Sequence, residues 1–275
     1  MKARRPLATA IFSAAVLPTA VLLAALATGT IAASLFPGAG SGHPRVTHRE
    51  PAVDATGGRG SFVTQDPTKA CDRPTTIGTV AAHQVVARAK PRASARPIAR
   101  FPRRNAIGAP QVFDLLGRVD TRRHGVWFRA LLPLRPNGTT GYLPQRTLRL
   151  SQTRYHVTIS RRSFRLTLWE GCRRLKSFPI GVGTGKTPTP VGRFYLIGLL
   201  KPPDSHSIYG SYAYGLSAYS DVIKDWRGGG IIGLHGTNDQ SSIGRRSSHG
   251  CIRMRNRDIE ALVKILPLGT PVEIT

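Results

Sequence analysis

Acidic residues are scarce in this sequence. It has 14 Asp or Glu against 40 Lys or Arg, which gives a formal net charge of +26 over 275 residues. The excess is mostly arginine, with 32 Arg and 8 Lys, and it predicts a polyanionic neighbour such as nucleic acid, anionic lipid or an acidic cell wall. Periodic apolar segments in the second half argue against a purely disordered polyelectrolyte.

Cysteine is also scarce, with Cys71, Cys172 and Cys251 as the three in the chain. Three are too few for a small disulfide-stapled protein or a four-cysteine zinc site, although a mixed Cys/His site stays open. Pairing of Cys71 with Cys172 would leave Cys251 as a free thiol. The alternative is that both stay reduced, and the sequence leaves this choice open.

The first 36 residues have the pattern of an export signal. Lys2, Arg4 and Arg5 precede an uncharged apolar run over residues 6–36, and residues 25–27 fit a small-x-small cleavage pattern. The run is also long enough to stay as a membrane anchor, so cleavage is left open. We therefore expect the rest of the chain in the extracytoplasmic cell envelope. Residues 37–75 are rich in Gly, Pro and Ser and are predicted to be a linker.

Residues 76–150 carry short β signals around an Asn137-Gly138 turn. The order of these signals resembles a small SH3-like β module, and the alternative is a β extension of the following domain. Within this segment, residues 88–104 are rich in Pro and Arg, which predicts a basic stretch outside any packed interior. We expect the segment to attract an anionic surface and to take no part in chemistry.

Residues 151–275 show a sharper β pattern. Apolar residues alternate with polar ones over residues 155–159 and 164–168, and further strands are predicted over 194–199, 231–234 and 271–274. Residues 257–265 form the one clear helix signal after residue 36, because their apolar side chains fall on one face. The sequence therefore predicts a mostly β fold with one short helix.

One cluster carries candidate chemistry. Cys251 stands between Gly250 and Ile252, where a tight turn would expose the sulfur and direct backbone N–H groups at one point. His235 follows an apolar β run and is a candidate base for this thiol, with the Gly236 carbonyl as the group that orients its ring. Each residue also has a structural alternative: a core cysteine, a histidine in a turn, or a zinc site formed with His249.

The surrounding residues distinguish these alternatives. Ser248-His249-Gly250-Cys251, preceded by His235-Gly236, resembles the signature of the L,D-transpeptidase (YkuD-like) catalytic domain family. Residues 187–194 resemble the T-P-x-G-x-F loop of the same family. The resemblance covers residues 153–275 and implies a β-sandwich with no metal or other cofactor. It implies Cys251 as nucleophile and His235 as general base, with a substrate-binding set of Gly236, Ser248, His249, Gly250 and Arg253.

The resemblance further implies an enzyme that acts on peptidoglycan stem peptides. Cys251 would attack the diaminopimelate carbonyl of a tetrapeptide stem, release D-Ala and pass the acyl group to a second stem as a 3→3 cross-link. Alternatives on the same fold are an L,D-carboxypeptidase or a wall-attachment transferase, because the sequence does not identify the acceptor. A non-catalytic basic protein is a third alternative.

The arginine-rich segments predict a partner among anionic wall polymers or membrane surfaces. Nucleic acid is not expected, since residues 88–104 contain a single aromatic residue, Phe101, and no recognised nucleic-acid-binding module. Organism and oligomeric state are left open.

Overall fold

The computed structural model of the chain describes residues 73–224 and 229–275. These residues fall in one compact unit, 61–275. The predicted export signal over 1–36, nearly all of the predicted linker and Cys71 lie outside the described residues. Cys172 is disulfide-bonded and Cys251 is a free thiol. Within the described part of the chain, no helix is long and apolar enough to cross a membrane.

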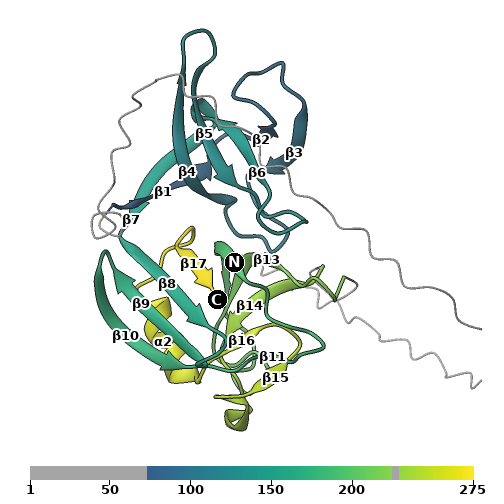
Figure 1. Cartoon of the computed structure of the whole chain (residues 1–275), viewed down its shortest axis with the longest axis vertical. Helices are drawn as coiled ribbons and strands as arrows, with labels where there is room; N and C mark the ends of the chain where they lie inside the picture. Colours follow the sequence, from purple (N-terminus) through teal and green to yellow (C-terminus); the bar gives the residue numbers. More distant parts are fainter. Residues whose placement is uncertain (1–72, 225–228) are drawn as a thin grey trace, which may run out of the picture. The chain divides into compact units, whose positions relative to one another are not determined.

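The first half of the described chain is a seven-stranded antiparallel sheet (Figure 1). Its strand order is β3-β2-β6-β5-β4-β1-β7, and a buried cluster around Phe113, Phe128 and Leu143 forms its core. The expected β module is present, whereas its SH3-like classification stays a prediction. The elements are β1 (Thr75–Val80), β2 (Gln84–Arg88), β3 (Pro97–Pro102), β4 (Val112–Thr121), β5 (Gly125–Leu131), β6 (Thr140–Pro144), the 3-10 turn η1 (Gln145–Thr147) and β7 (Leu148–Thr153).

The expectation that residues 88–104 avoid the packed interior is wrong. Strand β3 lies within this segment and pairs with β2, and Phe101 is buried in an edge-to-face contact with Phe113 at 5.1 Å between ring centroids. In β3 the Arg100 side chain is exposed while its neighbour Phe101 points inward. Because successive side chains of a strand alternate between faces, a basic stretch can still contribute to a core.

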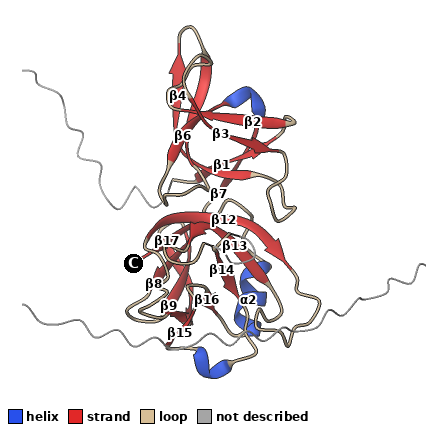
Figure 2. Ribbon diagram, turned by 90° about the vertical axis from the view of Figure 1, so that its right-hand side faces the viewer, coloured by secondary structure: helices blue, strands red, loops and turns tan. Residues whose placement is uncertain are grey.

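The second half is a mixed eight-stranded sheet with the order β10-β9-β8-β17-β12-β13-β14-β16, and β11 pairs separately with β15. Figure 2 shows the strands with the short helix α2 beside them. The mostly β prediction with one helix is confirmed for the described residues. The elements are β8 (Tyr155–Ser160), β9 (Arg165–Glu170), β10 (Arg173–Pro179), β11 (Val182–Gly183), β12 (Gly192–Leu200), β13 (Ala213–Tyr219), β14 (Ile231–His235), η2 (Gln240–Ser242), β15 (Arg246–Ser248), β16 (Ile252–Arg253), α2 (Asn256–Val263) and β17 (Pro271–Ile274).

The two sheets share buried contacts. A cluster combines three residues of the first sheet with two of β12, namely Ile77, Val112, Leu131, Tyr195 and Ile197. Beside it, the Arg193 Nε donates to the Asp114 carboxylate at 2.8 Å, and the Asp114 side chain is fully buried. Burial raises the pKa of Asp114, while the hydrogen bond and charge of Arg193 act in the opposite direction. The β module is therefore joined to the second sheet through a common core.

Candidate active site

The Cys251 turn is fixed by its own polar groups. Gly250 has a φ of +115°, a conformation that residues with a Cβ rarely adopt. The buried Ser248 hydroxyl accepts a hydrogen bond from the Gly250 N–H at 3.1 Å and donates to the Cys251 carbonyl at 2.6 Å. Ser248 therefore closes the turn from inside, and it holds the backbone on both sides of the cysteine.

The loop at residues 187–194 forms hydrogen bonds with the backbone of this turn. The Thr189 hydroxyl is buried, donates to the Gly250 carbonyl at 2.8 Å and accepts from the Gly183 N–H at 2.9 Å. Thr187 adds a weaker bond from its hydroxyl to the Ser248 carbonyl at 3.3 Å. The two segments that resembled family motifs in the sequence are thus in direct contact.

His235 ends strand β14, and its side chain is 4% exposed. Its Nδ1 lies 2.5 Å from the Gly236 carbonyl oxygen. A carbonyl only accepts hydrogen bonds, so Nδ1 carries the proton and Nε2 is left with a lone pair. Burial lowers the pKa of His235 from 6.5 to about 4, which keeps the ring neutral at physiological pH.

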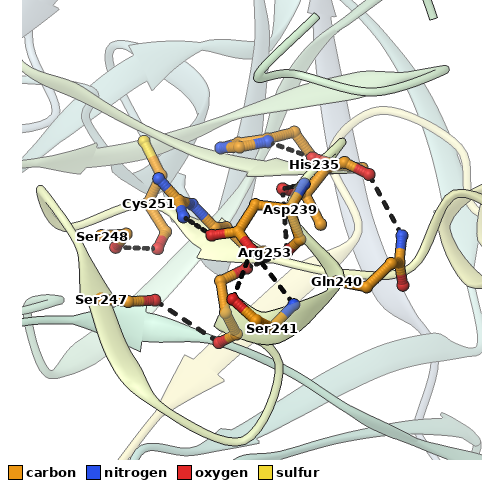
Figure 3. A network of polar contacts seen from close by, with 11 residues as sticks. His235, Asp239, Gln240, Ser241, Ser247, Ser248, Cys251 and Arg253 are labelled. Carbon is orange, nitrogen blue, oxygen red and sulfur yellow. Dashed lines mark hydrogen bonds and ion pairs between the residues drawn. The ribbon is translucent and has the colours of Figure 1, made fainter. Parts of the chain in front are cut away.

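Cys251 and His235 meet beside Gly233. A Cβ at Gly233 would lie 3.2 Å from the His235 Cδ2 and 3.6 Å from the Cys251 Sγ, so the glycine leaves room for both. Figure 3 shows one nitrogen of the His235 ring on the side of the sulfur, while Nδ1, which contacts the Gly236 carbonyl, is on the other side of the ring. The Gly233 N–H donates to Sγ at 3.3 Å. Burial nevertheless raises the pKa of Cys251, which favours the neutral thiol.

Arg253 lies near Cys251 in the site (Figure 3). Its Nη1 is 3.5 Å from the Asp239 carboxylate, and its side chain is 19% exposed. The Asp239 carboxylate also accepts hydrogen bonds from the Ser241 hydroxyl at 2.6 Å and from the Ser241 N–H at 3.1 Å, and these bonds lower the pKa of Asp239. Arg253 is thus an oriented cation at the site, and Asp239 is a partner that the sequence did not indicate.

Asn256 is a second residue that the sequence did not single out. Its Oδ1 accepts from the Thr237 N–H at 3.1 Å and from the Ser211 N–H at 3.3 Å. A Cβ at Gly236 would come within 2.2 Å of this oxygen, so the chain there needs glycine. Asn256 therefore positions the Gly236 carbonyl that orients His235. Its place at the start of α2 gave no chemical signal in the sequence.

Loop residue Tyr209 covers the histidine. Its ring stands edge-on to the His235 ring at 5.2 Å between centroids. Tyr209, His235, Cys251 and Arg253 line one pocket of about 490 Å³, together with Ser248, His249 and apolar residues. The structure thus brings together Cys251, His235, Ser248, His249 and Arg253, while Gly236 and Gly250 shape the backbone behind them. Among the described residues, no three His, Cys, Asp or Glu side chains gather as a metal site.

Comparison with known proteins finds relatives of the second half of the chain. Residues 154–274 match the YkuD family, described as the L,D-transpeptidase catalytic domain. The YkuD protein of Bacillus licheniformis, provisionally named an L,D-transpeptidase, is 39% identical over 121 residues, which cover 44% of this chain and 66% of that protein. Its namesake in Bacillus subtilis is 39% identical over 120 residues, with 44% and 65% covered.

The solved structure of Bdellovibrio bacteriovorus Bd1075 is 28% identical to this chain. The match covers 45% of this chain and 47% of that one, with a TM-score of 0.36. The chain spans just under two thirds of the length of the two Bacillus relatives. Residues 154–274 thus match the YkuD family, and the resemblance found in the sequence is confirmed.

We expect Thr189→Val to lower turnover by roughly tenfold or more, although Thr189 does not face the pocket. The change keeps the shape of the side chain but leaves the Gly183 N–H and the Gly250 carbonyl without their partner. Each buried polar group left unpaired costs about 1–3 kcal/mol, and here the cost falls on the Cys251 turn. Steady-state kinetics beside thermal unfolding measure both effects. Thr140→Val in β6 is the matched control, and equal activity of the two variants would contradict this role.

Proposed function

We propose that the chain is a peptidoglycan L,D-transpeptidase with Cys251 as nucleophile and His235 as general base. Sγ attacks the diaminopimelate carbonyl of a tetrapeptide stem, and the thiol proton passes to the lone pair on His235 Nε2. The tetrahedral intermediate collapses as the C–N bond to D-Ala breaks, and His235 returns the proton to the leaving amine. The product of this half-reaction is a thioester on Cys251.

The second half-reaction reverses these roles. The side-chain amine of another stem attacks the thioester, loses its proton to His235, and expels the Cys251 sulfur, which recovers a proton. One amide replaces another, so no external energy source is needed. The 3→3 cross-link forms between two diaminopimelate residues.

Backbone donors of the Cys251 turn are proposed to stabilise the oxyanion. The Gly250 N–H is bonded to the Ser248 hydroxyl, so it does not serve as a donor in this arrangement. The proposal therefore assigns the task to the other amides of the turn, beginning with that of Cys251. Arg253 and His249, which line the same pocket, are proposed to contact the stem peptide, with Arg253 facing a carboxylate.

The observation that carries the proposal is the His235 tautomer. The Gly236 carbonyl places the proton on Nδ1, and burial holds the ring neutral with a pKa of about 4. The other ring nitrogen is thus a free base that faces the sulfur (Figure 3). A histidine buried only for packing has no need of this orientation towards a thiol.

Hydrolysis of the same thioester would make the protein an L,D-carboxypeptidase, and an amine from another wall component would make it an attachment transferase. Incubation of the full chain with a soluble tetrapeptide muropeptide distinguishes these outcomes by mass spectrometry. We expect a dimer that lacks one alanine. A tripeptide monomer would indicate the carboxypeptidase, and unchanged substrate from folded protein would contradict the proposed function.

We also propose that the protein works outside the cytoplasm and that its arginine excess holds it near anionic wall polymer or a membrane surface. Export rests on the pattern of residues 1–36, and the attraction rests on the net charge of +26. Binding to isolated sacculi should then weaken as salt rises, because exposed charges are screened beyond roughly 10 Å at 0.1 M ionic strength. Binding that is insensitive to salt would contradict the electrostatic part of this proposal.

A further inference from the structure

The pocket that holds Cys251 and His235 contains one residue from the first half of the described chain. Ile107 lies in the loop between β3 and β4 and forms part of the pocket lining. It stands beside apolar residues of the second half of the chain, among them Leu200, Ile208 and Ile231. The lining of this pocket is therefore built from both halves of the described chain.

The loop that carries Ile107 is held in a defined conformation. The Asn105 Oδ1 accepts from the Ile107 N–H at 3.2 Å and from the Ala109 N–H at 3.1 Å, which tightens the turn around Ile107. The Asn105 Nδ2 donates to the Ile197 carbonyl in β12 at 2.8 Å and ties the loop to the second sheet. Ile107 is thus presented to the pocket by a rigid turn.

Two glycines of the second sheet receive the Ile107 side chain. Gly198 in β12 and Gly215 in β13 are register partners. A Cβ at Gly198 would lie 2.2 Å from the Ile107 Cδ1, and one at Gly215 would lie 3.5 Å from it. The missing side chains form a slot that Ile107 fills, while the residue stays partly exposed to the pocket.

A second contact from the first sheet fixes another part of the pocket. The Arg135 guanidinium donates to the carbonyls of Ser220 at 2.5 Å, Ile223 at 3.1 Å and Gly229 at 2.8 Å. Ser220 and Ile223, with Gly230, line the pocket. Arg135 therefore holds the segment after β13 at three points.

Neighbouring groups strengthen this contact. The Asn137 side chain donates to the Tyr219 carbonyl at 2.8 Å and accepts from the Tyr219 N–H at 2.9 Å. The Arg135 guanidinium also lies 4.9 Å from the centre of the Tyr219 ring. The turn at residues 135–137 thus forms hydrogen bonds with the end of β13 and with the Ser220–Ile223 segment that follows.

We infer that the first sheet completes the substrate pocket, with Ile107 contacting an aliphatic part of the bound stem peptide and Arg135 positioning the Ser220–Ile223 wall. This inference rests on the proposed function and replaces the expectation that residues 76–150 only attract an anionic surface. Ile107 is a specificity-determining residue in this account, and Arg135 is a positioning residue. Neither residue touches the Cys251 sulfur.

The test uses the full chain with Ile107→Val, Ile107→Ala, Arg135→Lys and Arg135→Ala. Arg123→Ala, in the exposed turn between β4 and β5, is the charge-matched control. Steady-state kinetics on the soluble tetrapeptide muropeptide give kcat and KM. The rate of Cys251 alkylation by iodoacetamide, which is too small to need the pocket wall, reports separately on the thiol and its base.

We expect a graded rise in KM, roughly tenfold for Ile107→Val and larger for Ile107→Ala, with kcat little changed, because each methylene group removed from an apolar pocket weakens binding by roughly tenfold or more. Arg135→Ala should lower kcat/KM by roughly tenfold or more. Arg135→Lys should lower it by less, because the ammonium keeps the charge and some donors, although it lacks the planar fork that binds several carbonyls. Alkylation should stay near the wild-type rate in all four variants.

Two outcomes would overturn the inference, and they are distinguishable. In the first outcome, the wild type turns over the muropeptide, and all four variants, folded, have the same kcat and KM as Arg123→Ala. The first sheet then does not build the pocket. If alkylation falls in step with kcat/KM, the variants act on the thiol and not on substrate binding, which also overturns it. Unchanged muropeptide with the wild type would instead refute the proposed function, and this inference would fall with it.

Discussion

Replacement of Cys251 by alanine or serine should abolish turnover and leave the fold intact, with a loss of roughly four decades or more. Cys251 is the free cysteine of the described residues, so neither change breaks a disulfide. Serine keeps an acceptor for the Gly233 N–H, which donates to Sγ at 3.3 Å. Its hydroxyl is a much weaker nucleophile than a thiol beside the same base.

Muropeptide turnover and thermal unfolding of both variants check this expectation. The disulfide-bonded Cys172 is not a suitable control, and Ser247→Ala next to the turn serves instead, because it changes a half-buried hydroxyl with one long bond at 3.4 Å. Activity of Cys251→Ala above the level of a blank reaction would remove the assignment of nucleophile.

Replacement of His235 by alanine should lower the rate of acylation by roughly two to four decades, the usual contribution of a general base. Exogenous imidazole should restore part of the rate, since the change leaves a space beside Sγ. His124→Ala in an exposed turn is the control. A rate within threefold of wild type, on a folded variant, would show that another group takes the thiol proton.

The pH dependence gives an independent check on His235. Its pKa of about 4 predicts that kcat/KM falls on the acid side near pH 4, and not near the ordinary 6.5. On the alkaline side, burial raises the pKa of the Cys251 thiol, so activity should persist past the ordinary range of a thiol. An acid limb near pH 6.5 would contradict the buried neutral base.

The same group links pH to stability. Between about 4 and 6.5 the unfolded chain binds a proton at His235 that the folded chain excludes, so the free energy of unfolding falls as pH falls through this window. The effect is on the order of 3 kcal/mol for this shift. His235→Gln should flatten that part of the pH profile, and an unchanged profile would argue against burial of a neutral histidine.

The two candidate reacting residues could be picked out from the sequence because they stand in short local motifs. Gly250-Cys251 marks a turn, and His235 follows an apolar run that forms β14. The loop at residues 187–194 was noticed in the sequence only as a family resemblance, and its contact with the Cys251 turn was not predicted. The bond from Thr189 to the Gly250 carbonyl that explains this contact joins residues 61 positions apart.

Other parts of the site depend on tertiary contacts that no local pattern marks. Asn256 and Asp239 are single polar residues near a helix and a 3-10 turn, where capping or solvent exposure is the common role. Ile107 is one apolar residue in a loop, and only the facing glycines 198 and 215 show why it is there. Strand β3 was missed because the Pro and Arg residues of the segment 88–104 hide the alternation that buries Phe101.

Cys251 is proposed to carry the acyl group during turnover. Rapid acid quench of the full chain during reaction with a tetrapeptide muropeptide, followed by intact-mass and peptide mapping, tests it directly. The account predicts one adduct on the peptide that contains Cys251, with the mass of the donor less one alanine, and no such adduct in Cys251→Ala. Product formation without any adduct under conditions where deacylation is rate-limiting, or an adduct on another residue, would contradict it.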